Sequence, residues 1–78
     1  MLPEIKIIDM RKAPSLVPER LGKLDVHFTY MIGAEGPFMI SVPAEDLQGK
    51  TFEEQKHIVR SMVEKEHAER LRWKGTTI

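Results

Sequence analysis

The residues best suited to chemistry in this sequence are two Glu-x-x-His pairs, Glu54 with His57 and Glu64 with His67. On a helix this spacing places a carboxylate beside an imidazole, as in the metal sites of di-iron helical bundles. The two pairs start ten residues apart, which turns one about 80° from the other around a helix. They therefore cannot share one site within a chain, and we interpret all four residues as exposed helix positions, with no metal ligand predicted.

Nucleophilic catalysis and phosphate binding are not indicated either. Ser15, Ser41 and Ser61 lack the surroundings of a nucleophile elbow, and the glycines match neither the Walker nor the dinucleotide-binding spacing. A chain of 78 residues also has little room for a deep substrate cleft. We predict a non-enzymatic protein with no catalytic residue, no cofactor and no small-molecule substrate.

Length and composition predict one ordinary globular domain over residues 1–78. Twelve basic residues balance twelve acidic ones, and there is no cysteine. This excludes a disulfide framework and a thiolate zinc site, and it disfavours a protein whose main work is neutralising phosphate. The N-terminal residues do not resemble a secretory signal, and glycines and prolines interrupt the weakly charged stretch at 28–44. We expect a soluble, cytoplasmic protein without a membrane segment.

Three stretches predict strands. Apolar and polar residues alternate over 24–32 and again over 37–43, which indicates an antiparallel hairpin with one buried face, joined by a four-residue turn from Gly33 to Gly36. The stretch at 4–11 is rich in β-branched residues, but its apolar positions do not alternate cleanly, which predicts contacts on both faces.

A long helix is predicted over 52–73. Thr51 and Glu54 have the capping-box spacing that starts a helix. An apolar stripe follows for about three turns and fails after Glu64, so we expect the second half of the helix to project past its own sheet. An alternative is a helix that ends near Glu69 and a short fourth strand over 70–78.

The predicted fold class is α+β, a two-layer β-β-β-α arrangement in which the long C-terminal helix packs on one face of a three-stranded, mainly antiparallel sheet. The core of this fold is predicted from the apolar positions of the strands and of the helix stripe. These positions are Ile5, Ile7, Val26, Phe28, Tyr30, Phe38, Ile40, Val42, Phe52, Val59, Met62 and Val63.

The C-terminal half of the helix is the candidate protein interface. Leu71, Trp73 and Ile78 lie beyond the part of the helix that a short sheet can cover. Small domains gain most from added burial, and open sheet edges tend to pair. We predict a small interaction module, a homo-oligomer or a binder of another protein, that uses these residues, an open sheet edge, or both.

Nucleic-acid binding is the alternative function. Basic residues gather around the proline-containing connector and again around Trp73, where phosphate contact and base stacking could combine. The candidate contacts are Arg11, Lys12, Arg20, Lys23, Arg70, Arg72 and Lys74. The zero net charge argues against this alternative.

Overall fold

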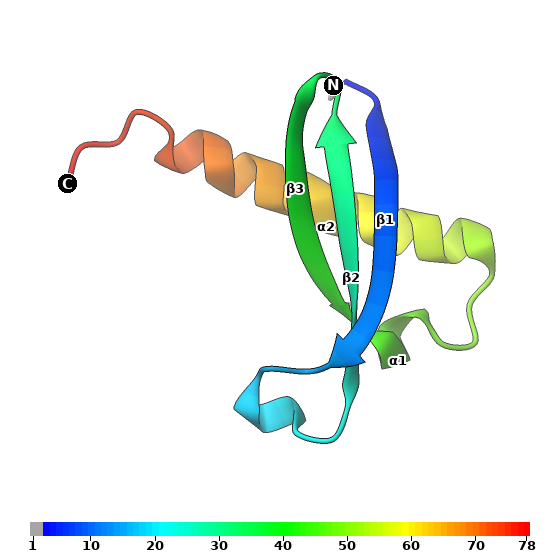
Figure 1. Ribbon diagram of the computed structural model, residues 1–78. Helices are drawn as coiled ribbons and strands as arrows, with labels where there is room; N and C mark the ends of the chain where they lie inside the picture. The colour runs from blue at the N-terminus through cyan, green and yellow to red at the C-terminus, as the bar shows by residue number, and fades with distance from the viewer. Residues whose placement is uncertain (1–2) are drawn as a thin grey trace.

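The computed structural model describes residues 3–78 as a three-stranded antiparallel sheet crossed by a long helix (Figure 1). The strand order is β1-β2-β3, so each strand pairs with the one before it in the chain. This confirms the predicted α+β fold. The elements are β1 (Ile5–Pro14), the 3-10 helix η1 (Pro18–Arg20), β2 (Leu24–Ile32), β3 (Glu35–Pro43), α1 (Ala44–Leu47) and α2 (Phe52–Trp73).

The helix α2 has the predicted bounds. The Thr51 side chain accepts from the Glu54 amide, and the Glu54 carboxylate accepts from the Thr51 amide at 2.9 Å, which completes the capping box. The helix continues to Trp73, and residues 74–78 belong to no strand. The alternative of a fourth strand over 70–78 is therefore wrong.

The hairpin turn is tighter than predicted. Ile32 pairs with Glu35, so the loop consists of Gly33 and Ala34 alone, and β3 begins at residue 35 rather than 37. Gly33 has φ +57°, the left-handed conformation that such a short turn requires. A register shift between Tyr30 and Ile32 accommodates the extra residue that the sequence pattern had assigned to the turn.

Strand β1 extends to Pro14 and contains a bulge. Ile7 pairs with Tyr30 and Asp9 pairs with Thr29, which leaves Ile8 as the extra residue. The bulge explains why the apolar residues of this stretch do not alternate. It returns Met10 to the sheet face that carries Ile7, and it leaves Asp9 on the opposite face.

The core lies between α2 and the sheet face formed by the apolar halves of β2 and β3. Its buried residues are Val26, Tyr30, Ile32, Ile40, Val42, Leu47, Val59 and Val63. Two predicted core residues are exposed instead, Ile7 at 42% and Phe52 at 71%. The physical reason is the path of α2, which crosses the sheet so that its first turns emerge past β1 (Figure 1). Phe52 is therefore too far out to cover the hairpin.

Candidate functional site

An apolar groove lies between β1 and the first half of α2, with a volume of about 1020 Å³. We call it the β1 groove. Strands β1 and β2 form its floor and α2 forms its wall. Its apolar lining residues include Ile5, Ile7, Met10, Leu24, Val26, Phe28, Phe52 and Val59. Four of these, Ile7, Met10, Leu24 and Phe52, are among the large apolar side chains that the chain exposes.

The charged side chains around the β1 groove come from β1 and α2. Lys12, Lys56 and Arg60 line it together with Glu53. The Lys56 ammonium pairs with the Glu53 carboxylate at 2.8 Å, and the Arg60 guanidinium lies 3.7 Å from the Glu64 carboxylate. An apolar floor with a polar, partly paired rim is typical of a protein interface.

At the β3 edge of the same sheet face, by contrast, the second half of α2 packs against the sheet. The Arg70 guanidinium donates to the Tyr30 hydroxyl at 3.1 Å, and its central carbon lies 3.8 Å from the centre of the Phe38 ring. A guanidinium stacked on an aromatic ring is a favourable cation–π contact. Arg70, a predicted nucleic-acid contact, therefore packs against its own sheet. This packing role could not be predicted from the sequence, because a charged arginine at this position looks like the end of the apolar stripe.

The two Glu-x-x-His pairs are not brought together. Glu54 caps the helix, and this hydrogen bonding to the Thr51 backbone holds the pKa of Glu54 below its usual value. His57 lines the β1 groove, whereas the Nδ1 atom of His67 is buried without a hydrogen-bond partner among residues 3–78. No group of three or more potential metal-ligating side chains occurs within the described range.

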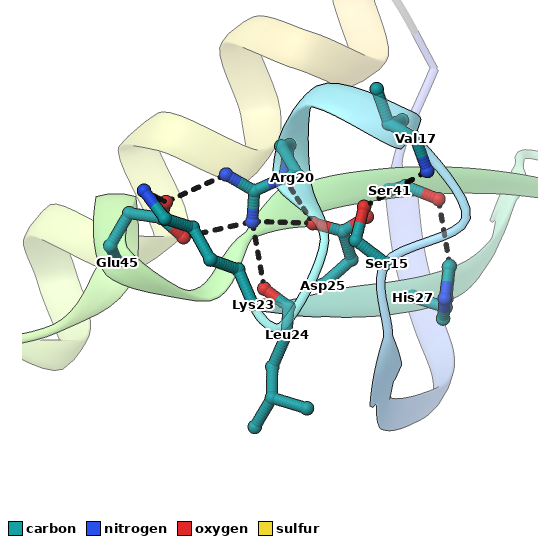
Figure 2. A network of polar contacts seen from close by, with 9 residues as sticks. All are labelled: Ser15, Val17, Arg20, Lys23, Leu24, Asp25, His27, Ser41 and Glu45. Atoms are coloured by element: carbon teal, nitrogen blue, oxygen red, sulfur yellow. Dashed lines mark hydrogen bonds and ion pairs between the residues drawn. The ribbon is translucent and has the colours of Figure 1, made fainter.

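A polar network joins the connector, β2 and α1 (Figure 2). Arg20 binds Glu45 with two parallel hydrogen bonds of 2.6 and 2.9 Å, donates from Nε to Asp25 at 3.0 Å, and donates to the Leu24 carbonyl at 2.9 Å. Such a bidentate arginine–carboxylate pair is strong and fixes geometry. The network therefore pins the connector between β1 and β2 to α1, which leads into α2.

The same contacts shift the pKa values of both carboxylic acids. The hydrogen bond from Arg20 lowers the pKa of Glu45 from 4.5 to about 2. The pKa of the buried Asp25 is lowered mainly by a hydrogen bond with the Ser15 hydroxyl and, to a smaller extent, by the hydrogen bond from Arg20. Sequence reasoning missed this network because its members are separated by irregular chain. Arg20 was therefore predicted from the sequence as a nucleic-acid contact.

The remaining predicted nucleic-acid contacts do not form one surface. Arg11 pairs with Asp9 at 3.1 Å, and Lys23 lies 3.6 Å from Glu45. Arg72 pairs with Glu69 at 3.2 Å near the end of α2, where Lys74 follows. Lys12 lines the β1 groove. The connector and the end of α2 lie at different ends of the molecule (Figure 1).

The predicted protein interface is exposed but dispersed. Leu71 and Trp73 are 57% and 61% exposed, and Ile78 lies in the tail after α2. Two residues of a helix that are two positions apart do not face the same direction. Leu71 and Trp73 therefore offer separate contacts, whereas the exposed residues of the β1 groove lie together.

Comparisons of the chain with family models, curated proteins and solved structures found no match. Within residues 3–78, no helix is both long and apolar enough to cross a membrane.

Proposed function

We propose that this chain is a non-catalytic interaction module that associates with a second copy of itself through the β1 groove and the adjoining edge of β1. The observation that carries the proposal is the apolar groove of about 1020 Å³ beside a ten-residue edge strand. Among residues 3–78, β1 pairs with β2 alone, so its outer edge is open. An open edge next to exposed apolar side chains favours association.

The two edge strands of the sheet differ in how well they could pair. Strand β3 contains Pro37 and ends at Pro43, and each proline removes a hydrogen-bond donor from the strand. Strand β1 has no proline before Pro14, its last residue. The β1 edge is also the one beside the groove. These differences favour β1 as the edge that recruits a partner.

Self-association suits the charge and the size of the chain. The formal net charge is zero, so two copies do not repel one another through a strong net field. A chain of 78 residues buries a smaller fraction of its surface than a larger domain does, and a second copy adds burial at the same apolar patch on both partners.

Sedimentation equilibrium over low to high micromolar concentrations tests the proposal. We expect a reversible dimer that Phe52→Ser weakens about 30-fold, because truncating this exposed aromatic costs about 1 kcal/mol in each of the two copies. Trp73→Ser is the matched control, since Trp73 is also an exposed aromatic residue of α2. It should leave the dissociation constant unchanged.

Two results would count against the β1 groove. A chain that stays monomeric at every concentration would overturn the proposal of self-association. A dimer that is weakened by Trp73→Ser and not by Phe52→Ser would assign the interface to the C-terminal half of α2, with Leu71, Trp73 and Ile78.

A further inference from the structure

We infer that two copies pair their β1 strands antiparallel about a two-fold axis at Met10, so that two three-stranded sheets become one six-stranded sheet. The inference rests on the proposed self-association and specifies its register. It follows from the direction of the free backbone groups of β1, the midpoint of the strand and the charges beside that midpoint.

The backbone groups of Met10 point away from β2. The Ser15 amide donates to the Lys23 carbonyl at 2.9 Å, which establishes Ser15 as a residue that faces β2. The direction of the backbone N–H and C=O groups alternates from one residue to the next along a strand. Met10 lies five residues before Ser15 with no bulge between them, so its backbone groups point toward the open edge. The Met10 amide indeed donates to the Asp9 carboxylate at 2.9 Å. A second strand would therefore find both hydrogen-bonding groups of Met10.

Met10 is also the midpoint of β1. The strand pairs with β2 at nine positions, and the pair Met10–Phe28 is the fifth. Antiparallel pairing about Met10 thus matches the whole strand with its copy, placing Ile5 opposite Pro14. Ile7 then meets Lys12, and the bulge at Ile8 takes up the extra residue. The paired side chains lie on the same face of the combined sheet at each of these positions.

The charges that flank Met10 are self-complementary in this register. Asp9 and Arg11 lie on the face opposite the groove, and pairing about Met10 sets Asp9 opposite Arg11 of the second copy, twice by symmetry. Within one chain these side chains pair at 3.1 Å, and both are exposed and free to exchange partners. A two-fold axis at Arg11 would instead oppose two arginines. An axis at Ile7 would leave residues 11–14 beyond the start of the partner strand.

The path of α2 supports the same assembly. Its first turns emerge past β1, on the side where the second copy would lie (Figure 1). Phe52 of each copy would then extend beneath the groove face of the other copy's β1, where Ile7 and Met10 are exposed. The pairing would cover apolar side chains on both strands that a single chain leaves in water.

Charge exchange tests the register. Asp9→Lys alone opposes lysine to arginine, and Arg11→Glu alone opposes aspartate to glutamate, so each variant should form its homodimer about tenfold more weakly. An equimolar mixture of the two pairs lysine with glutamate and arginine with aspartate. We expect heterodimers in that mixture by native mass spectrometry. The double variant Asp9→Lys/Arg11→Glu should form a homodimer with the affinity of the unaltered chain.

Disulfide trapping gives an independent measurement, because the chain has no cysteine. Directly opposed residues of antiparallel strands have Cβ atoms about 4.5–5.5 Å apart, close enough for a bridge after small adjustment. Met10→Cys should form a covalent dimer under mild oxidation. Met39→Cys, at an exposed methionine on the other edge strand, is the matched control and should not.

The outcomes separate the inference from the proposed function. A dimer of the unaltered chain with neither heterodimer rescue nor a Met10 bridge overturns the register and leaves self-association standing. Efficient trapping through Met39 would move the pairing to the β3 edge and also overturn the register. A strictly monomeric chain overturns both proposals.

Discussion

The two edge strands of the sheet, β1 and β3, differ sharply in how deeply the apolar side chains on the helix-facing side are buried. Over β3, Ile40 and Val42 are buried beneath α2, whereas over β1, Ile7 and Met10 are exposed although they are equally apolar. Both strands present their apolar side chains to the same layer. What separates them is the path of α2, which packs its middle turns on the hairpin and leaves a groove between its first turns and β1. Strand hydrophobicity alone therefore does not decide which part of a small sheet becomes core.

The helix itself shows the same difference. In its second half, Arg70 reaches the Tyr30 hydroxyl and the Phe38 ring and so extends the covered area beyond the apolar stripe. In its first turn, the Phe52 ring has the Lys56 ammonium 5.1 Å from its centre, a neighbour from its own helix. The polar residue Arg70 thus completes the packing on the β3 side, whereas the aromatic residue Phe52 stays exposed on the β1 side.

The largest effect is expected from matched truncations on the two edge strands. Ile40→Ala should lower the free energy of unfolding by about 3 kcal/mol, because it leaves a cavity in the core. Ile7→Ala removes a side chain that is already 42% exposed and should lower it by less than about 1 kcal/mol. Urea denaturation at low protein concentration, where dissociated chains dominate, measures both. Equal losses would show that β1 is covered within one chain.

A smaller effect is expected at the two arginines near the end of α2. Arg70→Ala should lower the free energy of unfolding by about 1–2 kcal/mol through the lost stacking and hydrogen bond. Arg72→Ala, which removes a surface pair with Glu69, should change it by less than about 0.5 kcal/mol. Arg70→Lys keeps the charge but loses the planar stack, so it should resemble Arg70→Ala. A lysine that restores full stability would show that charge alone matters at this position.

The smallest effect is expected on the pH dependence of stability, through the Arg20–Glu45 network. This network holds α1 in place, and α1 leads into the start of α2 beside the β1 groove. Binding to Arg20 lowers the pKa of Glu45 from 4.5 to about 2. Folding therefore favours the ionised acid, and its stabilisation is complete above about pH 4.5 and is lost as the pH falls toward 2. Glu45→Gln should flatten this part of the pH dependence of the urea midpoint. An unchanged slope would show that other acids are responsible for it.

Much of the local structure could be predicted because its causes lie close together in the chain. The capping box at Thr51 defines the start of α2 through neighbouring hydrogen bonds, and the alternation over 24–32 assigns the two faces of β2. The bulge at Ile8 could not be placed, because it is visible only in the register with Thr29. The short helix α1 could not be predicted either, because its four residues are too few to show a helical periodicity.

The candidate site was predicted less well. Exposure of Leu71 and Trp73 was expected from the failing apolar stripe, and both are exposed. The β1 groove was not expected, because Ile7 was predicted as a core residue of a strand and Phe52 as part of the apolar helix stripe, whereas both are exposed. Periodicity states which face of an element is apolar, but it does not state whether another element reaches that face.

By itself, the sequence determined the three strands and the long helix, their order and the apolar faces of β2 and β3, since propensity, capping and alternation act over a few residues. Only the tertiary structure decided where α2 crosses the sheet, and hence that Arg70 closes one side while Ile7 and Phe52 border a groove on the other. The crossing depends on packing between segments that are far apart in the chain, such as Val63 on the hairpin and Glu45 on Arg20.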